Sequence, residues 1–126
     1  MTAAVIASVI LAALAVLQAA VAAGMPWGRL VWGGRHRVLP TRLRVGSALS
    51  IALYGLFAAV LWGRASAAAG PASDAPAFFT VAAWVLFAYF GIGIAMNAIS
   101  RSAPERAVMT PACVLLAACA LVVATA

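Results

Sequence analysis

The chain has 126 residues, of which 67% are hydrophobic and only 8% are charged, and its mean hydropathy is +1.15. A soluble domain needs more polar surface than this composition provides, so most of the protein's surface must face lipid. The net charge is +6, but the arginines flank apolar segments as membrane anchors do, which argues against nucleic acid as a partner.

Four apolar segments are each near the length that crosses a bilayer core. We predict helices at residues 2–23, 41–63, 75–100 and 103–126. The first segment could instead be a signal peptide, because Ala20-Val21-Ala22 resembles a cleavage site. No positive charge precedes it, however, so we expect it to be retained. The predicted fold is an all-α, integral membrane four-helix bundle in a single domain.

The first loop, residues 24–40, and the start of the next helix are strongly basic. Within PWGRLVWGGRHRVLPTRLRVGS (26–47) the arginines are Arg29, Arg35, Arg37, Arg42 and Arg44. The second loop has Arg64, and the third has Arg101 and Arg106, so the count is seven against one. The positive-inside rule then predicts that loops one and three are cytoplasmic and that both termini are outside. We expect the basic loop to bind the anionic inner leaflet.

Residues 32–37, WGGRHR, contain the chain's only histidine. His36 lies between Arg35 and Arg37 and is the one candidate general base, but no Ser, Cys or Asp is spaced to complete a triad or a metal site. The segment also lacks the GK[ST] ending of a phosphate-binding loop. We expect Gly33 and Gly34 to form a turn that lets Trp32 lie at the membrane interface, while the flanking arginines and His36 are candidate lipid-binding residues.

Local signals mark the starts of the last two helices. SAPE, residues 102–105, has capping-box spacing, in which Ser102 accepts from the N3 amide and Glu105 reaches back to the Ser102 amide. Asp74 suits the N-cap of the third helix, with Pro76 in its first turn. These two acids are the only ones in the chain, so we expect no carboxylate to remain for a proton relay inside the membrane.

The last segment contains a proline and both cysteines. Thr110-Pro111 predicts either a kink in this helix or its true start, and the sequence leaves both open. Cys113 and Cys119 are six residues apart, which matches neither a CxxC redox pair nor zinc-ligand spacing. We interpret both as packing residues and expect no metal or cofactor.

Polar side chains recur at matching depths in the first three helices. At about 1.5 Å per residue, Gln18, Ser50 and Asn97 fall in the inner half of the bilayer, with Tyr54 and Tyr89 near its middle. Tyr89, Asn97 and Arg101 are separated by multiples of four residues, so they lie near one face of the third predicted helix. These side chains either form hydrogen bonds between helices or line a polar cavity that opens to the cytoplasm, and they are the candidate ligand-binding residues.

The loop sequences PWGRLVWGGRHRVLPTRLRVGS and NAISRSAPERAVMTP (97–111) resemble those of a group of small, uncharacterised bacterial membrane proteins with four predicted helices. The resemblance implies the four-helix architecture and a place in the bacterial cytoplasmic membrane, and it implies no activity. Small multidrug exporters have a glutamate in the first helix, where this chain has only Gln18. Quinone reductases of the vitamin K type need a CxxC pair, which is absent.

Three functions are compatible with these patterns. The first is a non-enzymatic membrane protein that self-associates as a homo-oligomer or serves as an accessory subunit of a larger membrane complex. The second is a binder or transporter of a small amphipathic molecule or lipid in a cavity around Asn97, Tyr54 and Tyr89. The third is an enzyme that acts on lipid with His36 as its base. We expect the first.

Overall fold

The structure, a computed structural model, describes residues 1–70 and 76–126. Its four long helices are α1 (Thr2–Ala22), α2 (Thr41–Ala68), α3 (Ala77–Ala98) and α4 (Ala103–Thr125). Two short 3₁₀ turns, η1 (Gly28–Leu30) and η2 (Trp32–Gly34), lie in the first loop. All four long helices have the length and the apolar composition to cross a membrane, so the predicted all-α, four-helix class is confirmed.

The ends of α2 and α3 differ from the prediction. α2 continues past residue 63 to Ala68, because the alanine-rich segment that follows Arg64 has high helix propensity. Arg64 is therefore a helix residue and not a loop residue; it is buried, and its guanidinium donates to the backbone carbonyl of Ala126. α3 begins at Ala77 with Pro76 at the N-cap position, and Asp74, the predicted N-cap, lies outside the described residues.

Pro111 lies inside α4, which runs without interruption from Ala103 to Thr125. Of the two possibilities that the sequence left open, a helix start at Pro111 is therefore wrong. Proline has no backbone N–H, so it cannot donate to the carbonyl of Ala107 one turn earlier. The helix tolerates the loss of this one hydrogen bond because helical residues precede and follow Pro111 on both sides.

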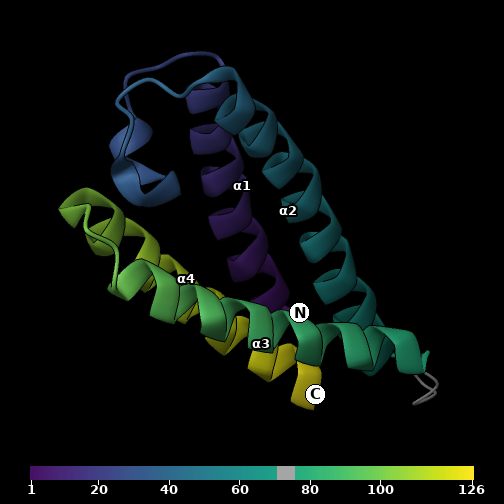
Figure 1. The fold of residues 1–126 in the computed structure, drawn as a ribbon. Coiled ribbons are helices and arrows are strands. Elements are labelled where there is room, and N and C mark those ends of the chain that lie inside the picture. The colour runs from purple at the N-terminus through teal and green to yellow at the C-terminus, as the bar shows by residue number, and fades with distance from the viewer. Residues whose placement is uncertain (71–75) are drawn as a thin grey trace.

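The helices form two antiparallel hairpins, α1 with α2 and α3 with α4 (Figure 1). The hairpins cross near the two chain ends, which lie close together, and they spread apart toward the first loop. The 3₁₀ turns of that loop occupy the side of the molecule where the hairpins diverge. We call the two ends of the bundle the crossing end and the loop end.

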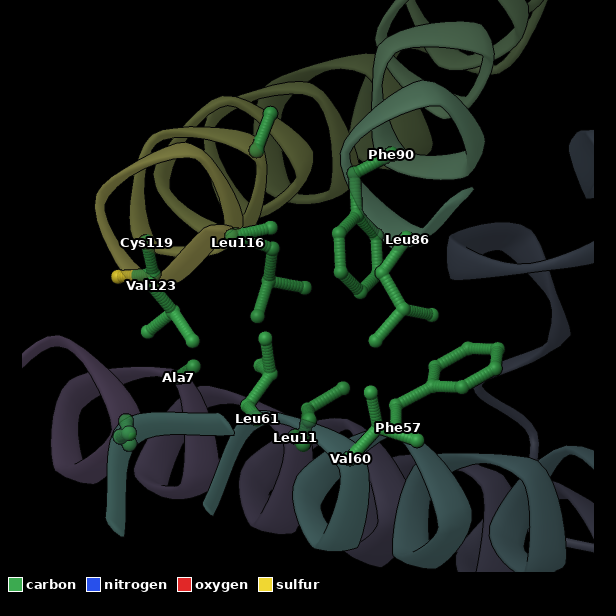
Figure 2. Packing of buried hydrophobic residues seen from close by; sticks show 14 residues of the cluster. Ala7, Leu11, Phe57, Val60, Leu61, Leu86, Phe90, Leu116, Cys119 and Val123 are labelled. Atoms are coloured by element: carbon green, nitrogen blue, oxygen red, sulfur yellow. The ribbon is translucent and has the colours of Figure 1, made fainter. Parts of the chain in front are cut away.

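A hydrophobic core joins the hairpins at the crossing end. Ala7 of α1 and Ala120 of α4 are both fully buried, and small residues such as these allow helices in lipid to approach closely. Leucines fill the space between them. In Figure 2, Leu11 and Leu61 on the first hairpin face Leu116 on α4.

A smaller cluster holds the first loop against the helices. It consists of Val21, Val31, Leu39 and Met109, all of which are buried. Because Val31 and Leu39 come from the loop while Met109 comes from α4, this cluster ties the loop to the second hairpin as well as to the first.

Candidate functional site

A cavity of about 460 Å³ lies at the loop end, between the diverging halves of the two hairpins. This volume is within the range of sites that hold small molecules in proteins. The lining residues are Leu14 and Gln18 of α1, Val31 and Trp32 of the loop, Ser50 and Tyr54 of α2, Tyr89, Phe90, Ile92, Gly93, Met96 and Asn97 of α3, and Glu105, Met109, Cys113 and Leu116 of α4. All four helices and the first loop therefore contribute to its wall.

The cavity is closed on one side and open on another. Gln18, Glu105 and Leu116, from α1 and α4, are 6%, 7% and 1% exposed. On α3, Ile92 and Met96 are 66% and 63% exposed, although they line the same cavity. The opening therefore runs along α3, on a surface that lipid would cover if the helices span a bilayer.

A polar contact inside the cavity joins the first two helices. The Gln18 Nε2 atom donates to the Tyr54 hydroxyl oxygen at 3.4 Å. The Gln18 Oε1 atom is also buried, and nothing in residues 1–70 or 76–126 donates a hydrogen bond to it. A buried acceptor without a partner costs about 1–3 kcal/mol, so this oxygen is a place where a guest with a donor group would gain affinity.

Asn97 lies where α3 packs against Cys113 of α4. Its Nδ2 atom donates to the Gly93 carbonyl at 2.8 Å and lies 3.5 Å from Cys113 Sγ on α4. A Cβ atom added to Gly93 would lie 3.1 Å from the same sulfur, so the glycine permits this close approach. Asn97 thus faces the inside of the bundle and borders the cavity.

Aromatic side chains separate the cavity from the hydrophobic core. The ring of Phe57 lies 5.1 Å from that of Tyr89 and 5.8 Å from that of Phe90, in edge-to-face geometries. Tyr54 is 6.4 Å from Phe57 on the same helix. Because Tyr54, Tyr89 and Phe90 also line the cavity, aromatic faces and edges form the part of its wall between α2 and α3.

The hydrogen-bond partners of Glu105 differ from those that the sequence predicted. The predicted capping box is wrong: Ser102 does occupy the N-cap of α4, but its hydroxyl donates to the Arg29 carbonyl of the first loop. The carboxylate of Glu105 accepts from the Gly33 amide at 3.3 Å and from the Ser100 hydroxyl. The first loop packs on the start of α4 and supplies these competing partners, so Glu105 is left at the cavity wall.

Trp32 forms the loop's own part of the wall. Its indole N–H donates to Ser47 Oγ at 3.0 Å, and a Cβ atom added to Gly46 would lie 2.7 Å from its ring. Trp32 has a φ of 54°, and Gly33 and Gly34 have φ values of 77° and 70°. The predicted turn at the two glycines is therefore present, and it places the tryptophan on α2.

The eight residues predicted to bind a ligand or lipid fall into two groups. Gln18, Tyr54, Tyr89 and Asn97 line the one cavity. The others are exposed and do not line it: Arg35, His36, Arg37 and Arg101.

Trp32 and Glu105 line the cavity and make hydrogen bonds to other parts of the chain, yet they were not among the residues predicted to bind a ligand. A signal for Glu105 was present, because Glu105, Met109 and Cys113 recur every four residues and so share one face of α4. No signal placed Trp32, since its position depends on a turn with positive φ values and on contacts with another helix.

No family model matches the chain, and comparisons with curated proteins and with solved structures find no match. The function must therefore be inferred from the chemistry of the cavity and from the surfaces around it.

Proposed function

We propose that this protein is a non-enzymatic integral membrane protein that binds a small amphipathic molecule in the cavity between its hairpins. The observation that carries the proposal is the cavity itself, which is large enough for a small molecule and contains a buried amide oxygen, Gln18 Oε1, without a partner in the described chain. A bundle that served only to pack helices would gain by filling this space with side chains.

The lining suits a molecule with one polar and one apolar end. Glu105 and Leu116 mark the limits of the lining on α4, and eleven residues at about 1.5 Å each separate them by about 16 Å. The Glu105 end is polar and lies beside the first loop, whereas the Leu116 end is apolar and adjoins the core. The opening along α3 would admit such a molecule from the lipid phase.

The arginine count supports an orientation for this site. With loops one and three in the cytoplasm of a bacterial cell, the loop end and its cavity lie in the inner half of the cytoplasmic membrane. Residues 69–76, which connect α2 and α3, contain no arginine. This absence strengthens the difference in positive charge between the two sides of the membrane. Cysteine placed at Thr41 should then react with an impermeant reagent only after cell lysis, and cysteine placed at Ala69 should react in intact cells. The opposite labelling pattern would reverse the orientation.

The alternative is a bundle that self-associates or serves as an accessory subunit. α3 offers the surface for it, because Phe78, Val85 and Ile92 are 60% or more exposed along this helix. In a bilayer, however, lipid tails satisfy such a surface as well as a protein partner does. The exposed face therefore favours neither reading, while the cavity favours binding.

Filling the cavity tests the proposal. Ser50 lines the cavity with a small side chain, and Leu49 beside it is 61% exposed on the outer face of α2. We expect native mass spectrometry with added octanol to show a saturable one-to-one adduct of the wild-type protein. Ser50→Phe should weaken this adduct by about tenfold or more, since the added ring occupies the site, and Leu49→Phe should leave it unchanged. Equal binding by both variants would refute the cavity as the site.

A further inference from the structure

We infer that the guest is an organic cation with an apolar tail, whose charged end lies at Glu105 and whose tail extends toward Leu116. This inference rests on the proposed function, since it names the class of molecule that the same cavity takes.

The charge of the lining is the first argument. Among the described residues that line the cavity, Glu105 is the only charged one. It is 7% exposed, and its hydrogen-bond partners, the Gly33 amide and the Ser100 hydroxyl, are both neutral. A buried carboxylate loses its hydration, and neutral donors replace only part of it. A cation in the cavity would supply the missing opposite charge in surroundings where screening is weak.

The arginines of the loop end do not supply that charge. Arg29, Arg101 and Arg106 are exposed to water, and in residues 1–70 and 76–126 the hydrogen-bond donors to Glu105 are Gly33 and Ser100, not these arginines. Arg106, the next residue along α4, donates to the Ser100 carbonyl at 2.6 Å, and Arg44 donates to the Leu39 carbonyl at 2.9 Å. These contacts hold both guanidinium groups on backbone oxygens.

Aromatic rings are the second argument. Trp32, Tyr54, Tyr89 and Phe90 all line the cavity and come from three different parts of the chain. The face of an aromatic ring attracts a cation, and the attraction grows when the site excludes water. Trp32 directly precedes Gly33, whose amide binds Glu105, so Trp32 lies at the carboxylate end of the cavity. Tyr54, Tyr89 and Phe90 pack on Phe57 at the end that adjoins the core, where the tail would lie. An ammonium group at Glu105 would therefore meet the Trp32 ring. An anionic guest would meet the negative charge of Glu105 and the negative ring faces instead.

The acceptors that remain available are the third argument. Gln18 Oε1 is buried in the lining with no donor in residues 1–70 or 76–126. An ammonium group carries only donors, so both kinds of acceptor in the lining, this amide oxygen and the Glu105 carboxylate, suit it better than they suit an anion. Beyond these groups the lining continues with Met109 and Leu116, which suit a hydrocarbon tail.

Three probes with the same eight-carbon tail test the inference: octylammonium, octanol and octyl sulfate. We expect octylammonium to bind the wild-type protein about tenfold more tightly than octanol at pH 7, and octyl sulfate to bind most weakly. Native mass spectrometry titrations in a neutral detergent give the three affinities. If octanol shows no saturable adduct that Ser50→Phe weakens, the proposed function itself fails. If octanol binds in this way and octylammonium binds no more tightly, only the cation inference fails.

Glu105→Gln isolates the charge. The amide has the same size and keeps an acceptor for Gly33 or Ser100, so we expect about a tenfold loss for octylammonium and less than a twofold change for octanol. Arg106→Gln is the matched control, because it changes an exposed charge on the adjacent residue and should alter octylammonium binding less than twofold. Equal and opposite effects of the two variants would show a long-range charge effect and overturn the site.

Trp32→Leu decides the matter if Glu105→Gln does not fold. Trp32 lines the Glu105 end of the cavity and is 43% exposed, and its replacement removes one side-chain hydrogen bond, to Ser47. Loss of the ring should weaken octylammonium about threefold or more while octanol binding stays within twofold. Parallel losses for both probes would mean that Trp32 acts only by shape, and the cation inference would then be wrong.

Discussion

The crossing end and the loop end of the bundle are built in different ways. At the crossing end the hairpins meet through alanines and leucines such as Ala7, Ala120 and Leu61, none of which is exposed. At the loop end the buried side chains include Gln18 and Glu105, and the space between the hairpins is a cavity. Helices in lipid gain little from the hydrophobic effect, so close packing of small residues has to hold one end together. The other end is then free to open.

At the loop end, hydrogen bonds from the first loop add to the small hydrophobic cluster of Val21, Val31, Leu39 and Met109. Trp32 binds Ser47 on α2, the Gly33 amide binds Glu105 on α4, and the Arg29 carbonyl accepts from Ser102. The loop thus bridges both hairpins across the side where they diverge. Rigidity at this end therefore depends on a small cluster and a few directional hydrogen bonds, which should respond to mutation differently from the large core of the crossing end.

The largest effect is expected from a cavity made at the crossing end. Leu61 is fully buried, and Leu61→Ala should lower the free energy of unfolding by about 2 kcal/mol, the lower end of the range for buried leucines. The lower end applies because the unfolded helix remains in lipid. Leu56→Ala is the control, since Leu56 is 56% exposed on the same helix. Unfolding in mixed detergent micelles measures both, and equal effects would mean that the crossing end is not the packed core.

Two glycines of α2 should respond with opposite signs. Gly46→Ala places a methyl group within 2.7 Å of the Trp32 ring, so it should displace the indole and lower the free energy of unfolding by about 1 kcal/mol. Gly55 has open space around it, so Gly55→Ala should raise the same quantity by about 0.5–1 kcal/mol through helix propensity. Tryptophan fluorescence should change only in Gly46→Ala. An unchanged spectrum there would show that Trp32 does not lie on α2.

The sequence predicted the four helices better than the path of the first loop, and the reason is physical. Hydrophobic length fixes a membrane helix almost alone, because backbone groups in lipid must be satisfied within the helix. Their positions along each helix also predicted that Gln18, Tyr54, Tyr89 and Asn97 lie at comparable depths. In the structure these four residues line one cavity.

What the sequence could not give is the path of the first loop. The SAPE capping box was a sound local prediction, but Ser102 and Glu105 each found a partner in the first loop, about seventy residues away. Such contacts depend on how the two hairpins are placed relative to each other. The same dependence explains why Arg35 and His36, prominent in the sequence, lie outside the cavity while Trp32, three residues before Arg35, lines it.

A smaller effect on stability is expected when Gln18 is replaced. This substitution distinguishes a ligand-binding residue from a packing residue. Gln18→Leu removes the buried oxygen that lacks a partner and loses one long hydrogen bond to Tyr54, so the free energy of unfolding should change by less than about 1 kcal/mol. Octanol and octylammonium binding should nevertheless weaken. A loss of 2 kcal/mol or more in stability would place Gln18 among the packing residues and remove the contrast between the two ends.

The smallest effects are expected on the exposed arginines of the loop end, where the sequence predicts attraction to anionic lipid. Arg29, Arg35, Arg37 and Arg42 are exposed, and each positive charge near an anionic leaflet contributes about 1 kcal/mol. Mobile headgroups require charge more than a rigid pair of donors, so each Arg→Lys variant should lose only a small and similar part of its lipid preference.

Arg44 differs from the other four arginines of residues 26–47, because its guanidinium group makes a hydrogen bond within the protein. Its Nε atom donates to the Leu39 carbonyl at 2.9 Å, and its guanidinium packs on Gly24, whose φ is 101°. Lysine lacks the Nε donor, so Arg44→Lys should loosen the first loop and lower stability while lipid preference stays near that of the other variants. The ratio of phosphatidylglycerol to phosphatidylcholine retained from mixed vesicles measures lipid preference, and thermal unfolding measures stability. If one exposed arginine, such as Arg35, alone abolished the preference, the loop would hold a specific phosphate site and the charge of the loop end would not act as a whole.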